Sequence, residues 1–470
     1  MDAFVSPLVA LFEIQRRAYA REPFPTWPKR RDRLERLGEL LREHDAEIAM
    51  AIAHDFGHRS QTETQLVEVL PSVQSVKQAL RYGRSWMRAR RATTSRWFWP
   101  ARSCVMPQPL GVVGIMVPWN YPLFLCFAPL VAALAAGNRA LVKLSERTPE
   151  FARVFDELIK RRFSPDEVAV VHGDVDVASA FTRLPFDHLL FTGSTRVGRK
   201  VMRAASANLT PVTLELGGKS PCVIAPGYSL DKAAERIVFG KLINAGQTCI
   251  APDYVVVPRN ELNNFASACR TQAQRMYPSG LNQRDYCSVI DQHHYERLTQ
   301  LIDDVVRQGA RIEPLFAGPV RDDSTHRLAP LLVFDAPSNS ALMREEIFGP
   351  VLPVIAYERV EDALSYIRRR PRPLALYWFD HDRRRTEHAL RVTHAGGVAV
   401  NDTLIHVAQE GLPFGGIGPS GMGHYHGRWG FDTFSKLKPV FIQSRWNALS
   451  WFNPPWSERT QRVLEWIKRF

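Results

Sequence analysis

The stretch that most limits how this chain can fold is residues 103–138, which contain no charged side chain. Its length alone would suit a membrane-spanning helix, which needs about 20 consecutive apolar residues. Its interior argues against a span, because Pro118-Trp119-Asn120-Tyr121-Pro122 would break such a helix. We therefore divide the run into a buried strand over residues 112–117, a turn, and a buried helix over residues 123–136. Unbroken apolar runs of this kind are typical of parallel sheets covered on both faces.

Strands and helices alternate along the next part of the chain. We expect strands over residues 140–144, 168–172 and 188–192, each followed by a helix. Ahead of the charge-free run, Leu and Ile recur at helical spacing through residues 34–52 and indicate packing helices. The alternation predicts an α/β fold with a doubly wound parallel sheet, which binds ligands at the carboxyl ends of its strands.

A second α/β region is predicted after residue 217. It includes a strand over residues 253–258 and helices over residues 261–277 and 292–308. Residues 90–106, which precede the charge-free run, are rich in Thr, Trp and Val and suit an extended ribbon. The sequence thus predicts two α/β domains and a small β element.

The composition, with 45% hydrophobic and 23% charged residues, is that of an ordinary soluble globular protein. Much of the formal net charge of +13 sits in short arginine runs, and no recognition-helix, zinc-finger or RNA-binding signature accompanies them. We interpret this charge as a solvated basic surface that does not bind nucleic acid. A mild steering effect on an anionic cofactor or substrate stays open.

The six cysteines are scattered and lack CxxC pairs or zinc-like spacing, which favours a reduced, cytoplasmic protein without a metal site. The N-terminus lacks the basic leader of a signal peptide. The C-terminal tail holds Trp446, Trp451, Trp456 and Trp466 among basic residues. Weak peripheral contact of this tail with a membrane is an alternative, although it contains no run of spanning length.

Cys249 is the candidate nucleophile, within the segment Asn244-Ala245-Gly246-Gln247-Thr248-Cys249-Ile250. A thiolate attacks carbonyl carbons well if one group keeps it deprotonated and another later activates water. Glu215, near the end of a β-rich run, is the candidate for the second task. The alternative is that Cys249 is a small buried apolar residue, because free cysteine is among the most buried types.

The run Gly193-Ser194-Thr195-Arg196-Val197-Gly198 follows a predicted strand and leads into a predicted helix. Glycine-rich turns at this place bind pyrophosphate in dinucleotide-binding folds, but Thr195 stands where the usual fingerprint has its second glycine. The alternative is a tight turn between strand and helix that binds nothing.

A series of motifs runs through the chain: Pro118-Trp119-Asn120-Tyr121-Pro122, the turn from Lys143 to Glu146, Phe191-Thr192-Gly193-Ser194-Thr195, Leu214-Glu215-Leu216-Gly217-Gly218, Gly246-Gln247-Thr248-Cys249, Glu346-Ile347-Phe348-Gly349-Pro350 and Pro413-Phe414-Gly415-Gly416. Their order resembles that of the aldehyde dehydrogenase superfamily over roughly residues 30–440. The turn at residues 249–254 is similar to the class 3 branch, and residues 406–413 and 421–427 resemble its coniferyl aldehyde dehydrogenases. Membrane-bound fatty aldehyde dehydrogenases of this branch end in a hydrophobic tail, which this chain lacks.

The resemblance implies a mechanism in which Cys249 attacks the aldehyde carbon to form a thiohemiacetal. The Asn120 amide and the backbone N–H of Cys249 would hold the oxyanion; the alternative role for Asn120 is to cap the following helix. Hydride transfer to a nicotinamide would leave a thioester. Glu215 would then deprotonate water, so that a free acid is released in preference to a coenzyme A ester.

The resemblance also implies an NAD(P) site. Lys143 and Glu146 match the positions that hold the adenosine ribose. A carboxylate repels a 2′-phosphate, so Glu146 favours NAD, whereas Lys143 pulls toward NADP and leaves dual use open. The cofactor residues that the resemblance implies are Trp119, Lys143, Glu146, Gly193, Ser194, Val197, Glu346 and Phe348.

Apolar residues expected to line the aldehyde tunnel are Tyr121, Phe124, Leu125, Ile250 and Phe414. They suit a bulky aromatic aldehyde of the coniferyl type, with a long-chain fatty aldehyde as the alternative; core packing would require the same residue types. A non-catalytic structural relative is a further alternative, which the joint presence of Cys249, Glu215 and Asn120 disfavours.

By the same resemblance, residues 1–89 and 108–216 form the NAD(P)-binding domain and residues 217–430 the catalytic domain. Residues 90–107 and 431–470 form an oligomerisation ribbon and a C-terminal tail. A homodimer is the expectation for the class 3 branch.

Overall fold

The charge-free run folds into strand β3 (Val112–Met116) and helix α5 (Phe124–Ala136), in which every residue is buried. The computed structural model describes residues 2–447 and 449–469, and no helix within them is long and apolar enough to cross a bilayer. β3 pairs with a strand on each side, and α5 packs against neighbouring helices. β3 and α5 lack charges because protein surrounds them, whereas residues 103–109 of the run lie in the largely half-buried strand β2 (Arg102–Pro109).

β3 lies inside a six-stranded sheet with the order β17-β7-β6-β3-β4-β5. All pairs in this sheet are parallel except β17–β7. The chain passes from β3 outward to β4 and β5, and then returns to β6 on the other side of β3. This reversal creates a topological switch point between β3 and β6, where α/β sheets bind ligands. The other strands are β4 (Arg139–Lys143), β5 (Val168–Val171), β6 (His188–Gly193), β7 (Val212–Leu216) and β17 (Gly421–Met422).

Helices cover both faces of this sheet. Val113 and Ile115 of β3 enter one hydrophobic core together with α2 and α5, whereas Val112 and Met116 enter a second core with α1. The alternation follows from the two-residue period of a strand. The expectation of a doubly wound sheet is therefore confirmed. The helices around it are α1 (Asp2–Arg21), α2 (Trp27–Asp55), α3 (Gln61–Thr64), α4 (Leu70–Trp86), α6 (Pro149–Arg162), α7 (Val175–Phe181), α8 (Thr195–Ala205) and α15 (Gly427–Thr433), and a π-helical turn (Gln65–Val69) joins α3 to α4.

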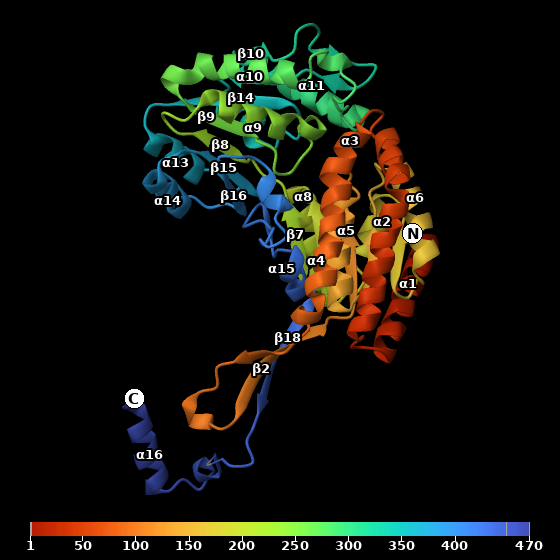
Figure 1. The fold of residues 1–470 in the computed structure, drawn as a ribbon, viewed down its shortest axis with the longest axis vertical. Helices are drawn as coiled ribbons and strands as arrows, with labels where there is room; N and C mark the ends of the chain where they lie inside the picture. The colour runs from red at the N-terminus through yellow and green to blue at the C-terminus, as the bar shows by residue number, and fades with distance from the viewer. Residues whose placement is uncertain (1, 448, 470) are drawn as a thin grey trace.

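The second α/β region contains a seven-stranded sheet with the order β10-β13-β14-β9-β8-β15-β16, parallel except for β10–β13. Figure 1 shows it at the opposite end of the molecule from the C-terminus. Its strands are β8 (Pro221–Ile224), β9 (Tyr254–Pro258), β10 (Arg311–Pro314), β13 (Leu331–Phe334), β14 (Val351–Tyr357), β15 (Ala375–Phe379) and β16 (Gly397–Val400), with a separate hairpin of β11 (Arg321–Asp322) and β12 (Arg327–Leu328). The helices of this region are α9 (Leu230–Leu242), α10 (Leu262–Met276), α11 (Gln292–Arg307), α12 (Ala341–Arg344), α13 (Val360–Arg368) and α14 (Arg383–Val392).

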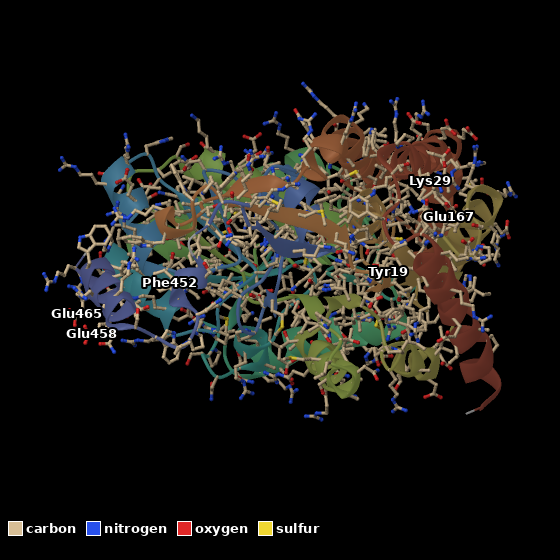
Figure 2. The ribbon with its side chains drawn as sticks, turned by 90° about the horizontal axis from the view of Figure 1, so that it is seen from below. Tyr19, Lys29, Glu167, Phe452, Glu458 and Glu465 are labelled. Carbon is tan, nitrogen blue, oxygen red and sulfur yellow. The ribbon has the colours of Figure 1, made fainter. Side chains whose placement is uncertain are left out.

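A three-stranded arm of β1 (Arg90–Ala92), β2 (Arg102–Pro109) and β18 (Ser435–Ile442) extends from the body, and α16 (Glu458–Lys468) lies at its far end (Figure 1). The extended ribbon expected near residue 100 is thus present, with β18 as its partner. In Figure 2 the tail residues Phe452, Glu458 and Glu465 lie on the opposite side of the molecule from Lys29 and Glu167. The tail therefore leaves the N-terminal helices uncovered.

Strand β17 comes from the range that we assign to the second domain, yet it completes the first sheet. Gly421 pairs with Glu215, and Met422 pairs with Leu214. Helix α15 follows directly and packs against α5 and α4. Residues 421–433 thus return to the first sheet after the second one is finished.

Candidate active site

Most of the polar residues singled out in the sequence lie at one edge of the first sheet. Strands β3, β4, β6 and β7 run parallel, so their carboxyl ends meet at that edge. The residues at these ends are Trp119 and Asn120 after β3, Lys143 and Glu146 after β4, Gly193, Ser194 and Val197 after β6, and Glu215 at the end of β7.

The loop that carries Cys249 has a strained and well-fixed backbone. Asn244, Ala245 and Gly246 have φ of +52°, +49° and +76°, and a Cβ on Gly246 would lie 2.4 Å from a backbone oxygen. Gln247 holds the loop, because its Nε2 donates to the Asn244 oxygen at 2.9 Å and its Oε1 accepts from the Ile290 N–H at 3.0 Å. Such strain persists only where the surroundings enforce it, and it is common at active sites.

Cys249 is partly exposed and faces a cavity of about 400 Å³. The backbone N–H groups of Cys249 and Ile250 lie near the sulfur and lower the pKa of its thiol. Burial raises the pKa of the thiol, and the negative charges of Glu346 and Glu215 raise it further. The thiol is therefore the resting form, and Glu215 is near enough for its charge to act on the sulfur.

Glu215 is 2% exposed, and neither of its carboxylate oxygens has a hydrogen-bond partner among the described residues. Burial raises its pKa well above the usual value of 4.5. Burying a carboxyl group without hydrogen-bond partners costs folding free energy. Such groups are therefore common at reactive sites, where function explains why they are retained. Once ionised, it is a stronger base than a solvated carboxylate.

Asn120 is buried in the turn after β3. Its Nδ2 donates to the Gln247 carbonyl at 3.1 Å, and its own carbonyl accepts from Arg59 Nη1 at 3.1 Å and Asn244 Nδ2 at 3.0 Å. An amide nitrogen carries two hydrogens, so one N–H of Asn120 remains for a further acceptor. These bonds tie the Asn120 turn to the loop of Cys249.

A buried charge network under this turn was missed by the sequence analysis. Arg59 forms ion pairs with Glu68 at 3.0 Å and with Glu63 at 3.6 Å. Glu68 accepts from the N–H groups of Leu123 and Phe124, so it caps α5 and Asn120 does not. Burial raises the pKa of Glu63 to about 7. A glutamate within the apolar segment Leu66-Val67-Glu68-Val69-Leu70 was the available signal.

The cavity at Cys249 is lined by all five residues predicted for the tunnel. The hydroxyl groups of Tyr121 and Thr248 are hydrogen bonded at 2.6 Å, which joins the two walls beside the sulfur. The predicted lining residues are Tyr121, Phe124, Leu125, Ile250 and Phe414. The lining residues that were not predicted are Leu66, Val67, Leu70, Pro71, Gln74, Phe239, Ile243, Thr248, Leu404, Ile405, Val407, Ala408 and Glu410.

The predicted ribose and pyrophosphate residues form two groups on either side of β3. Lys143 Nζ lies 3.9 Å from Glu146 Oε2 and donates to the Leu144 carbonyl at 2.7 Å. Ser194 caps α8, where its Oγ accepts from the Val197 N–H at 3.3 Å. A lysine beside a carboxylate suits sugar hydroxyls, and the N-terminus of a helix suits pyrophosphate.

Glu346 approaches this edge from the second α/β region. A Cβ on Gly217 would lie 2.0 Å from Glu346 Oε2, so only glycine permits this approach. Burial and the charge of Asp253 raise the pKa of Glu346 to about 8. Its Oε1 is buried without a hydrogen-bond partner among the described residues and can accept from a ligand hydroxyl.

Trp119 contacts Phe348, and their ring centroids are 5.3 Å apart in an edge-to-face arrangement. These rings provide apolar surface at one edge of the sheet. The Lys143–Glu146 pair, the N-terminus of α8 and the unpartnered Glu346 oxygen add charged and polar groups along the same edge. This donor set fits a nicotinamide dinucleotide.

Comparison with known proteins agrees with this geometry. The model of the aldehyde dehydrogenase family matches residues 15–440. A probable coniferyl aldehyde dehydrogenase of Pseudomonas aeruginosa is 49% identical over 98% of this chain and 96% of that protein. A coniferyl aldehyde dehydrogenase of Pseudomonas sp. is 42% identical over 88% of this chain and 86% of its own.

A solved structure of Staphylococcus aureus AldH in a substrate-bound state has a TM-score of 0.93 and 35% identity, and the match covers 98% of this chain and 99% of that one. The matched family model extends over nearly the whole chain and includes both sheets. The chain thus belongs to the aldehyde dehydrogenase family, whose members are NAD(P)-dependent oxidoreductases that act on aldehydes.

Proposed function

We propose that this protein oxidises an aromatic aldehyde of the coniferyl type to its carboxylic acid, with NAD as acceptor. The observation that carries the proposal is the shared cavity of Cys249 with Tyr121, Phe124 and Phe414. A cavity of about 400 Å³ with apolar and aromatic walls has the size of small-molecule sites. The names of the two Pseudomonas relatives support the choice of aldehyde.

Covalent catalysis begins when the Cys249 thiol gives up its proton to water in the cavity and the sulfur bonds to the aldehyde carbon; the carbonyl π bond breaks, and its oxygen becomes negative. The backbone N–H of Cys249 and the second N–H of Asn120 stabilise this oxyanion, and each such donor contributes about 3 kcal/mol to lowering the barrier. The fixed backbone of residues 244–247 keeps these donors in place. Position and electrostatics thus come from the protein.

A bound NAD(P) would supply the acceptor for the hydride, which leaves the former aldehyde carbon as the oxyanion re-forms its C=O bond. Glu215 then acts on the acyl group that remains on Cys249, by taking a proton from water so that the oxygen attacks the acyl carbon. The sulfur leaves as a thiolate and the acid is released. The buried carboxylate of Glu215 supports this assignment, because no described residue donates a hydrogen bond to the oxygens that would take the proton.

We assign Lys143 and Glu146 to the adenosine ribose, Gly193, Ser194 and Val197 to the pyrophosphate and adenine, and Trp119, Glu346 and Phe348 to the nicotinamide side. The carboxylate of Glu146 supports NAD over NADP, because it repels a 2′-phosphate.

The test is NADH formation by the purified protein across aromatic and alkyl aldehydes, with NAD and NADP compared in parallel. We expect cinnamyl-type aldehydes and NAD to give the highest kcat/KM. Cys249→Ala should lower kcat by roughly 10⁴-fold or more while leaving the circular dichroism spectrum unchanged. Activity that persists in this variant would refute Cys249 as the nucleophile, and activity that rises with alkyl length would favour a fatty aldehyde.

A further inference from the structure

One residue of the substrate cavity stands out by its chemistry. Among the described residues that line this cavity, Glu410 is the single carboxylate; its neighbours in the wall include Pro71, Val407 and Ala408. An apolar wall gains nothing from a carboxylate as packing material, and burying one is costly unless it finds donors. The chemistry just assigned to Cys249 and Glu215 does not use it.

Glu410 is held firmly in place. Its Oε1 contacts the Ser75 hydroxyl on α4, and its Oε2 accepts from the backbone N–H of Gly427 at 3.1 Å at the start of α15. A Cβ on Gly427 would lie 2.3 Å from the Glu410 carbonyl, so the contact between these two segments is close. The side chain therefore cannot turn away to solvent without breaking both contacts.

The carboxylate nevertheless keeps accepting capacity. Two oxygens provide about four lone-pair positions, and the contacts with Ser75 and Gly427 use two of them. Gln74, which precedes Ser75 on α4, brings a second polar group to the same wall. The α4 side of the cavity thus carries two polar side chains, and Glu410 also borders a smaller cavity lined by Ser75 and Gly427.

We propose that Glu410, with Gln74 beside it, is a specificity residue that binds a phenolic hydroxyl on the aromatic ring of the aldehyde substrate. This inference rests on the proposed function and narrows its substrate class to ring-hydroxylated aromatic aldehydes. A phenol donates a strong hydrogen bond to a carboxylate. An alkyl chain would remove water from the same carboxylate and donate no hydrogen bond in return, which should weaken the binding of fatty aldehydes.

The test compares coniferyl aldehyde with its 4-O-methyl ether, which has a similar shape but no hydroxyl to donate. We expect the wild-type protein to prefer the phenol by roughly 10- to 100-fold in kcat/KM. Glu410→Leu should bring the ratio close to one, retain activity on the ether, and raise kcat/KM for a medium-chain alkanal several-fold. Glu410→Gln, which keeps an accepting oxygen and the contact with Gly427, should give an intermediate ratio.

Gln409→Leu is the matched control, because the adjacent side chain is exposed and lies outside the cavity wall. It should leave both rates and their ratio unchanged. A purely structural role of Glu410 would lower activity on both substrates equally and leave the ratio intact, which would overturn the inference. A wild-type ratio near one would overturn it without any variant, while aldehyde oxidation itself would still stand. If the wild type oxidised no aldehyde at all, both the inference and the proposed function would fail.

Discussion

At the scale of single residues, burial disfavours the charged form of both reactive groups in the site. Burial raises the pKa of both Cys249 and Glu215, and the charge of Glu215 adds to the shift at the sulfur. A low-dielectric surrounding strengthens the later interactions with the oxyanion. It also requires that the thiol of Cys249 lose its proton before the sulfur attacks. Because no described residue donates a hydrogen bond to Glu215, we expect its loss to affect only the hydrolysis of the acyl-enzyme.

Glu215→Gln should slow hydrolysis of the acyl-enzyme and lower kcat by roughly 10²- to 10⁴-fold, because the water loses its base. Bond formation at Cys249 and reduction of the cofactor should continue. Stopped-flow absorbance should therefore show a burst of about one NADH per active site, followed by slow turnover. Cys249→Ala serves as the control and should show no burst.

The pH profile provides a second check on the same residue. The pKa of Glu215 is raised, so the carboxylate form increases as the pH rises through that raised value, and kcat should rise with it. The glutamine variant cannot ionise and should lose this limb of the profile. An unchanged profile would assign the general base to another group.

At the scale of elements, the Arg59 network joins the link after α2 to the start of α5 and the loop of Cys249. Arg59→Met would leave Glu63 and Glu68 buried without their cation. Breaking a buried ion pair in this way typically costs about 3–5 kcal/mol, so the thermal unfolding midpoint should fall clearly. Differential scanning fluorimetry measures this shift.

The control for Arg59 is the triple variant Arg59→Met, Glu63→Gln and Glu68→Gln, which removes the stranded charges. It should recover part of the lost stability, because neutral amides are cheaper to bury than carboxylates. Equal midpoints for the wild type and the single variant would mean that water reaches the two glutamates.

Strands and helices with a clear hydrophobic pattern were predictable, because burial of an element on its faces requires apolar residues at regular positions in the sequence. The strand and helix of residues 103–138 and the alternation up to residue 205 follow from the sequence alone. β17 did not follow, since a two-residue strand has no period. Glu68 and Glu410 escaped as well, because their importance depends on partners more than 50 positions away along the chain, at Leu123 and Ser75.

At the scale of the whole molecule, the arm exposes apolar side chains that a single copy leaves uncovered. Trp99 is 70% exposed, Phe441 50% and Ile442 55%. A small sheet with uncovered apolar side chains is marginal in water. We therefore expect a second copy of the chain to cover the arm in a homodimer.

Light scattering after size-exclusion chromatography should give twice the chain mass for the wild type. Phe441→Glu with Ile442→Glu should shift the protein toward the monomer, because two carboxylates would be buried at the interface. Met50→Glu, at an exposed position on α2, is the control and should leave the dimer intact. A monomeric wild type would contradict this expectation.

The position of β17 has a consequence for synthesis on the ribosome. The strand that carries Glu215 has an open edge until Gly421 and Met422 emerge, after the whole second sheet has been translated. An unpaired strand edge can pair with other nascent chains. The edge of β7 remains unpaired while more than two hundred further residues are translated. Chaperone dependence should therefore be greatest for polypeptides that stop just short of residue 421, and Glu215, our proposed general base, acquires its final neighbour only as translation nears its end.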